Sequence, residues 1–173
     1  MQLASLIRDV PDFPVPGILF KDITTLIRDA RALREVIDRM AAHYADTPVD
    51  IVAAIESRGF IFGAPLAYRL GAGFVPVRKP GKLPTRAINE SYSLEYGTNT
   101  LEMHADAIQP GQRVLVVDDL LATGGSARAA INLVERLGGQ VVGVAFLIEL
   151  DFLHGRDKLQ GYPVLSLVHF NGE

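Results

Sequence analysis

The sequence predicts an α/β fold in which helices flank a central, mostly parallel sheet. Several runs of apolar residues lack polar–apolar alternation, which is typical of strands that are buried on both faces. Segments with apolar residues at helical spacing separate these runs, and alternation of strands with helices is typical of a parallel sheet. A chain of 173 residues fits one domain, so we expect residues 1–173 to form a single domain.

The composition excludes several classes of protein. Hydrophobic residues make up 49% of the chain and charged residues 21%, a balance that favours a compact fold over disorder. The net charge of −3 argues against nucleic acid as a partner, and the absence of cysteine excludes disulfides and cysteine metal sites. The first residues lack the apolar core of a signal peptide, and no apolar run approaches ~18 residues. We therefore expect no membrane partner and a cytoplasmic location.

The first part of the chain combines two expected helices with a proline-rich loop. We expect a short amphipathic helix over residues 1–10 that ends at Pro11. Three prolines within residues 11–17 predict a stiff loop. Apolar residues at helical spacing then predict a helix over residues 30–44, with Asp29 as its N-cap.

The middle of the chain contains two apolar strands and a long polar segment. Residues 51–55 and 74–77 are expected to be strands, and a helix over residues 60–70 is expected to end at Gly71. Residues 78–91 are polar, basic and rich in proline and glycine. A connector of this length is usually a functional lid or is disordered.

The rest of the chain begins with an expected two-stranded arm. Polar–apolar alternation in residues 92–96 and 100–103 predicts two strands that are joined at Gly97. The remaining expected elements are a strand over residues 114–117, a helix over 126–137 that ends at two glycines, and strands over 141–150 and 164–168.

The most informative segment follows the strand over residues 114–117. Asp118 and Asp119 end this strand, which is where open α/β sheets bind ligands. The glycines of residues 123–126 let the backbone approach a ligand, and the following helix N-terminus favours an anion. Two carboxylates would repel a phosphate, so they are expected to face a neutral polyol or a metal ion. A ribose 5-phosphate meets both demands. The alternative is that the acids are solvated and the glycines only shape a turn.

Four segments resemble one known family, in the same order and at the same spacing. Residues 116–126, Val-Val-Asp-Asp-Leu-Leu-Ala-Thr-Gly-Gly-Ser, resemble the phosphoribosyl-pyrophosphate-binding motif of the type I phosphoribosyltransferases, in particular their adenine-specific branch. Residues 13–22 are similar to the hood over the base, and residues 56–60 to the pyrophosphate loop. Residues 78–84 together with 93–97 resemble the mobile catalytic loop.

The resemblance implies a fold, a reaction and a cofactor. The fold would be that of the type I phosphoribosyltransferases, with a small hood at about 11–28 and a flexible loop at about 78–97. The reaction would be a pentosyl transfer in purine salvage, from 5-phosphoribosyl 1-pyrophosphate to adenine, which gives AMP and pyrophosphate. Mg²⁺ would bind mainly through the pyrophosphate and ribose of the substrate, so no direct metal ligand is predicted. The family is usually homodimeric.

The resemblance also assigns roles to individual residues. Catalytic roles fall on Glu95, Tyr96 and Arg58. Ribose 5-phosphate binding falls on Asp118, Asp119, Ala122, Thr123, Gly124, Gly125 and Ser126. Pyrophosphate binding falls on Ser57, Arg58, Arg78, Lys79 and Lys82. Adenine binding falls on Leu19, Phe20, Lys21 and Leu121, although Lys21 stands where relatives often carry arginine, which puts its contact with the base in doubt. Taken singly, Arg58 and Glu95 also fit ordinary surface positions, and so does the basic cluster of Arg78, Lys79, Lys82 and Arg86.

Three rival functions stay open at this point. A regulatory module would bind the same sugar phosphate without catalysis, but related regulators carry an added DNA-binding domain, for which we find neither length nor a basic face. A second rival is the same reaction with hypoxanthine, xanthine, guanine or orotate. An unrelated nucleotide-binding domain is the third, and it is disfavoured because neither a Walker lysine loop nor a spaced G-x-G-x-x-G occurs.

Overall fold

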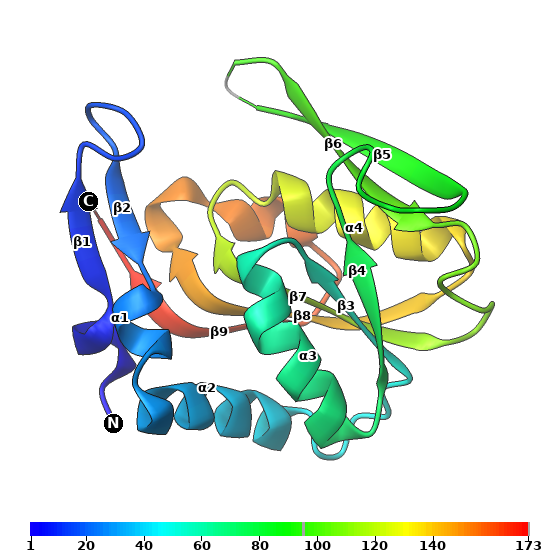
Figure 1. Cartoon of the computed structure of the whole chain (residues 1–173), viewed down its shortest axis with the longest axis horizontal. Coiled ribbons are helices and arrows are strands. Elements are labelled where there is room, and N and C mark those ends of the chain that lie inside the picture. The colour runs from blue at the N-terminus through cyan, green and yellow to red at the C-terminus, as the bar shows by residue number, and fades with distance from the viewer. Residues whose placement is uncertain (95, 173) are drawn as a thin grey trace.

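The computed structural model describes residues 1–94 and 96–172, and its centre is a five-stranded sheet with helices on both faces (Figure 1). The strand order is β4-β3-β7-β8-β9, and all neighbours in it are parallel. These strands are β3 (Ile51–Ile55), β4 (Gly73–Val77), β7 (Arg113–Leu121), β8 (Gln140–Leu150) and β9 (Val164–Phe170). The predicted α/β class and parallel sheet are confirmed.

Helices α2 and α3 cover one face of the sheet, and α4 covers the other (Figure 1). Their bounds are Ala30–His43, Arg58–Leu70 and Gly125–Arg136, and a one-turn helix, α1 (Thr24–Ile27), precedes α2. The predicted N-cap of α2 is confirmed, because the side chain of Asp29 accepts hydrogen bonds from two backbone N–H groups of the first turn. Gly71 ends α3 in the left-handed conformation, as predicted.

Helix α3 lies unusually close to strand β3. A Cβ atom added to Gly63 would lie only 2.5 Å from the Cβ of Ala54, so a larger residue would push the helix away from the strand. This close packing follows a very short connection, because α3 begins at Arg58, three residues after the end of β3. The start of α3 is thereby held at the carboxyl edge of the sheet.

The N-terminal segment forms a hairpin and not the helix that we expected over residues 1–10. A 3-10 helix spans only Leu3–Leu6, and β1 (Arg8–Pro11) then pairs antiparallel with β2 (Leu19–Asp22). Two ion pairs cross this hairpin, from Arg8 to Asp22 and from Lys21 to Asp9. The helix prediction was wrong because the partner strand lies beyond the proline loop, outside the window of a local pattern.

The two-stranded arm is confirmed, but it begins earlier than expected. Strands β5 (Ala87–Ser93) and β6 (Thr98–His104) pair antiparallel and pack beside α4 (Figure 1). Residues 87–91, expected to be part of the irregular connector, are therefore strand residues. Two 3-10 turns, Asp151–Leu153 and Gly155–Leu159, join β8 to β9. Among the described residues, no helix has the length and apolar character needed to span a membrane.

Candidate active site

Two segments that are far apart in the sequence meet at the carboxyl edge of the sheet. Strands β3 and β7 are parallel neighbours, so the residues that follow β3 lie beside the end of β7. The Nε atom of Arg58 donates a hydrogen bond to Oδ2 of Asp119 at 2.6 Å, although 61 positions separate the two residues. A predicted pyrophosphate residue and a predicted ribose residue are thus brought into contact.

A cavity of about 240 Å³ opens at this edge. It contains every residue that we predicted for ribose 5-phosphate binding. The lining consists of Arg58, Tyr92, Leu94, Asp118, Asp119, Leu120, Leu121, Ala122, Thr123, Gly124, Gly125, Ser126 and Ala127. The turn before α4 is therefore open to a ligand and not occluded by packing.

The cavity floor includes the N-terminus of α4. Its N-cap is Gly124, which has a φ of +88°, a conformation that residues with a side chain rarely adopt. Glycine also has no side chain that would cap the free N–H groups of the first turn, so these groups can bind an anion. A Cβ atom on the next residue, Gly125, would lie 2.8 Å from the ring of Tyr92. Residues 122–126, which we call the phosphate loop, therefore depend on glycine for both shape and space.

The two carboxylates of the cavity are nearly buried. Asp118 is 8% exposed and Asp119 is 6% exposed. The pKa of Asp118 lies well above its usual range, mainly because burial disfavours its charge and also because the charge of Asp119 is close. Its Oδ1 atom accepts a hydrogen bond from the backbone N–H of Asp119 at 2.8 Å. The site therefore holds one carboxylate that Arg58 neutralises and one that is costly to ionise without a ligand.

Two of the predicted pyrophosphate residues, Arg78 and Lys79, contact Glu56. Ser57 is the exposed N-cap residue of α3. The Nε atom of Arg78 and the backbone N–H of Lys79 both donate hydrogen bonds to Oε1 of Glu56, at 3.1 and 2.8 Å. Lys82 is exposed farther along the same loop. Glu56 thus fixes the start of the basic loop beside the end of β3.

The predicted adenine residues of the hairpin differ in where their side chains lie. Leu19, Phe20 and Lys21 all belong to β2, and the ring centre of Phe20 lies 5.8 Å from the guanidinium carbon of Arg58. The ammonium group of Lys21 instead lies 2.7 Å from Oδ1 of Asp9. Phe20 therefore lies beside Arg58, which lines the cavity, whereas Lys21 is engaged in an ion pair within the hairpin.

Leu121 lines the cavity, but its side chain belongs to the core. It is only 1% exposed and packs with the apolar residues beneath α4. The preceding residue, Leu120, also lines the cavity and keeps part of its side chain exposed. Of these two leucines, Leu120 is therefore the one with apolar surface to offer a ligand, and we did not predict it.

Of the two predicted catalytic residues of the arm, the structure describes Tyr96. Glu95 lies outside the described residues. Tyr96 is 87% exposed, at the turn between β5 and β6. The arm instead contributes Tyr92 and Leu94 to the cavity, and we did not predict either of them. The available signal was the period of two, which puts positions 92 and 94 on one side of an extended chain.

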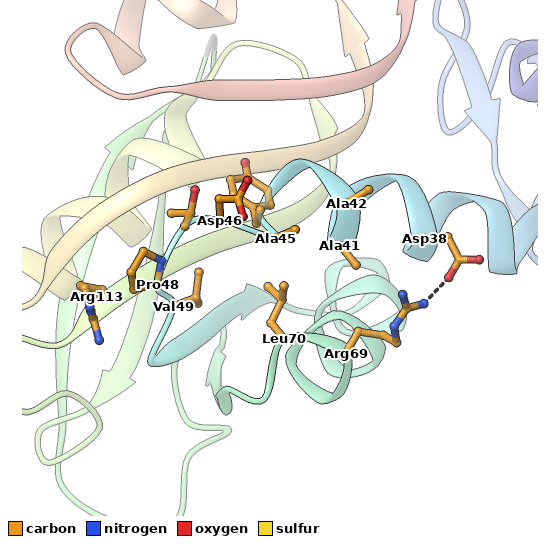
Figure 2. Close-up of a pocket in the computed structure, with 12 residues that line it drawn as sticks. Asp38, Ala41, Ala42, Ala45, Asp46, Pro48, Val49, Arg69, Leu70 and Arg113 are labelled. Carbon is orange, nitrogen blue, oxygen red and sulfur yellow. Dashed lines mark hydrogen bonds and ion pairs between the residues drawn. The ribbon is translucent and has the colours of Figure 1, made fainter.

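A larger cavity, of about 620 Å³, lies at the opposite edge of the sheet (Figure 2). It is lined by residues that precede β3, such as Pro48 and Val49, and by Arg113, the first residue of β7. Figure 2 shows Arg69 directed toward Asp38, with which it forms an ion pair. Because parallel sheets bind ligands at their carboxyl edge, the smaller cavity is the candidate active site.

Comparison with known proteins matches the chain to one family over most of its length. The family model of the phosphoribosyl transferase domain matches residues 24–168. The adenine phosphoribosyltransferase of Chloroflexus aurantiacus is 63% identical over 168 residues, which cover 97% of each chain. That of Thermotoga neapolitana is 58% identical and covers 97% of this chain and 99% of its own.

Solved structures agree in fold over nearly the whole chain. The crystal structure of adenine phosphoribosyltransferase from Thermoanaerobacter pseudethanolicus has a TM-score of 0.95 at 56% identity and covers 98% of each chain. The enzyme from Saccharomyces cerevisiae, crystallised with an imino-altritol bisphosphate and adenine, has a TM-score of 0.91 at 42% identity and covers 96% of each chain. The predicted type I phosphoribosyltransferase fold is confirmed. The chain belongs to the phosphoribosyl transferase family, among the adenine phosphoribosyltransferases.

Proposed function

We propose that the protein transfers ribose 5-phosphate from 5-phosphoribosyl 1-pyrophosphate to adenine in purine salvage, giving AMP and pyrophosphate. The observation that carries this proposal is the cavity in which two buried carboxylates lie beside an uncapped helix N-terminus. A sugar diol can donate hydrogen bonds to the carboxylates, while its 5-phosphate accepts from the N–H groups. The names of the related enzymes supply the base, adenine.

In this proposal the ribose 5-phosphate is held along the whole cavity. Asp118 and Asp119 accept hydrogen bonds from the ribose hydroxyls, and residues 122–126 bind the phosphate through backbone N–H groups and the hydroxyls of Thr123 and Ser126. Fixing the sugar in this way orients its C1 atom toward the base. Orientation of reactants contributes up to ~7–11 kcal/mol to lowering a barrier.

Pyrophosphate leaves C1 as the bond to the purine nitrogen forms, and the sugar acquires positive charge in between. Ser57, Arg58, Arg78, Lys79 and Lys82 are the groups proposed to neutralise the leaving anion. Arg58 is already beside the cavity, where its charge is shared with Asp119. Cations placed where negative charge develops stabilise the transition state by a few kcal/mol each.

We propose that Mg²⁺ accompanies pyrophosphate at this site. Carboxylate oxygens such as those of Asp118 and Asp119 are the donors that Mg²⁺ accepts, directly or through its own waters. The bound ion would add positive charge to the leaving group. Arg58 occupies one oxygen of Asp119, which favours an ion held mainly by the substrate.

For the base, we propose Phe20 as one wall and Leu120 as the other, with Leu121 packed behind it and backbone groups of Leu19 reading the exocyclic amine. Phe20 lies beside Arg58, which lines the cavity, and Leu120 keeps more exposed apolar surface than Leu121. We retain Glu95 as the group that assists proton transfer at the purine and Tyr96 as its neighbour that orients it. Closure of the arm would exclude water from the base and from the group that exchanges its proton.

The test is conversion of radiolabelled adenine to AMP in the presence of the activated sugar and Mg²⁺, with and without a chelator. Unlabelled hypoxanthine, guanine, xanthine and orotate are then added one at a time as competitors. We expect AMP formation that depends on Mg²⁺ and that the other bases inhibit weakly. Binding of ribose 5-phosphate without any turnover would favour a regulatory module and contradict the proposed reaction.

We further propose that the protein is a cytoplasmic homodimer. Support for a second copy comes from α2 and α3, where Leu33, Ile37, Pro65 and the 87% exposed Tyr68 line an apolar groove. A highly charged sugar pyrophosphate cannot cross a bilayer, so its enzyme must share the compartment in which it is made. Sedimentation equilibrium tests the dimer, and cell fractionation tests the location.

A further inference from the structure

The backbone of the segment that joins β8 to β9 packs against the back of the phosphate loop. A Cβ atom on Gly155 would lie 2.5 Å from the carbonyl oxygen of Ala122 and 2.7 Å from Cδ1 of Leu121. In the other direction, a Cβ atom on Gly124 would lie 2.5 Å from the carbonyl oxygen of Gly155. The two backbones thus lie in contact, and neither can move toward the other. The place of Gly155 therefore limits where the phosphate loop can lie.

Glu149 holds this connecting segment, residues 151–159, in place. It is 5% exposed, and its register partners on the neighbouring strands are Leu121 on β7 and His169 on β9. Its carboxylate accepts hydrogen bonds from Nε of Arg156, at 2.8 and 2.9 Å, and from Oγ of Ser166 at 3.0 Å. Arg156 directly follows Gly155. The ion pair therefore fixes the residue next to the contact with the phosphate loop.

Other charged groups near Glu149 also hold the connecting segment in place. Nδ1 of His169 lies 2.8 Å from Oδ1 of Asp151 and 3.5 Å from Oε2 of Glu149. Glu149, Asp151 and His169 have the spacing of metal ligands, but Arg156 already occupies the carboxylate of Glu149. The hydrogen bond with His169 holds the pKa of Asp151 below its usual range. These contacts tie the start of the connecting segment to β9 through Asp151 and its middle to β8 through Arg156.

We propose that the Glu149–Arg156 pair positions the phosphate loop for ribose 5-phosphate. Neither residue is among those that line the cavity, so both act through the contact of Gly155 with Ala122 and Gly124. Removal of the guanidinium leaves a buried carboxylate with an unmatched charge, and the segment must move to hydrate it. The N–H groups of the loop then lose their fixed geometry. This inference rests on the proposed site for ribose 5-phosphate.

The experiment compares Arg156→Gln with a matched control, Arg113→Gln. Arg113 makes a similar pair, with two side-chain hydrogen bonds to Asp50, but at the opposite end of β7. Affinity for ribose 5-phosphate is measured by calorimetry, the two Michaelis constants by steady-state kinetics, and the mobility of residues 122–126 by amide hydrogen exchange. We expect R156Q to bind ribose 5-phosphate about tenfold more weakly. In R156Q we also expect faster amide exchange in the phosphate loop and a KM for adenine within about twofold of wild type. In the control, R113Q, the affinity and both Michaelis constants should equal those of wild type.

Two further variants keep the test decisive. Gly155→Ala leaves Glu149 and Arg156 in the chain but puts a methyl group against Ala122 and Leu121, and we expect a similar loss of ribose 5-phosphate affinity. Arg156→Lys keeps the charge and should recover part of the affinity. The inference is overturned if R156Q and G155A bind ribose 5-phosphate as tightly as wild type. It is also overturned if, in R156Q, the KM for adenine rises as much as the KM for the activated sugar. A wild-type protein that binds ribose 5-phosphate but makes no AMP would contradict the proposed function alone.

Discussion

Asp118 is the residue at which folding and function are most clearly opposed. Burial raises the pKa of its carboxyl above the value in an unfolded chain. The folded state therefore binds this proton more tightly, so the free energy of unfolding falls as the pH rises between the two pKa values. At neutral pH a charged Asp118 destabilises the protein that has no ligand. A sugar hydroxyl that donates to it would offset this cost.

Asp118→Asn is expected to stabilise the unliganded protein while it weakens ribose binding. The amide oxygen can still accept from the N–H of Asp119, and the buried charge is gone. We expect the free energy of unfolding, measured with urea, to rise by about 1 kcal/mol at pH 7. This difference from wild type should disappear below about pH 4. Calorimetry should show weaker binding of ribose 5-phosphate. A variant that is less stable at pH 7 than wild type would contradict the origin of this pKa.

Glu95 is the residue to which the family resemblance assigns proton transfer at the purine. We expect Glu95→Gln to lower kcat by about 10²-fold while the KM for the activated sugar changes little, because an amide cannot exchange a proton with the purine. The matched control is Glu90→Gln on β5, where the glutamate pairs with Arg136. Equal rates for E95Q and wild type would remove Glu95 from the chemistry.

For single helices, strands and turns, the sequence pattern predicted those features that depend on contacts within one segment of chain. Helix α2 was predicted because its cap, Asp29, and its apolar stripe lie within one segment of chain. The turn over residues 123–126 was predicted because glycine and a following helix are both local signals. Strand β1 could not be predicted in this way, since its partner, β2, lies eight residues beyond its end. The first strand of the arm was predicted to begin five residues too late because Asn89, Glu90 and Ser91 are polar.

The cap of α2 offers a test of how far element stability is separate from the site. Asp29→Ala removes the side chain that accepts from the N–H groups of Arg31 and Ala32. We expect a loss of about 1 kcal/mol in the free energy of unfolding, measured by urea denaturation. Helix α2 contributes no residue to the site cavity, so both Michaelis constants should stay at their wild-type values. A change in one Michaelis constant would show that the stability of α2 and the geometry of the site are coupled.

At the scale of the whole molecule, the site exists only because parallel strands bring their carboxyl ends together. The sequence placed Asp118 and Asp119 at the end of a strand over residues 114–117, but β7 extends to Leu121 and contains both acids. The sequence also contained no sign that β3 and β7 are neighbours, which the contact of Arg58 with Asp119 requires. The packing of Gly155 on Gly124 was equally invisible, because 31 positions and a whole strand separate the two glycines. Contacts of this kind depend on topology, whereas a motif depends on one stretch of chain.

Because the site joins elements that are formed only in the folded protein, ribose 5-phosphate should bind the folded state alone and stabilise the whole domain. At a ligand concentration of about one hundred times Kd the gain is about 2.7 kcal/mol. For a chain of this size that corresponds to a rise in Tm of about 5–10 °C. Inorganic phosphate should produce a smaller rise, because it occupies the phosphate loop but offers no hydroxyls to Asp118 and Asp119. In the double variant Asp118→Asn with Asp119→Asn, the two ligands should stabilise almost equally. A full ribose 5-phosphate shift in that variant would exclude the carboxylates from sugar binding.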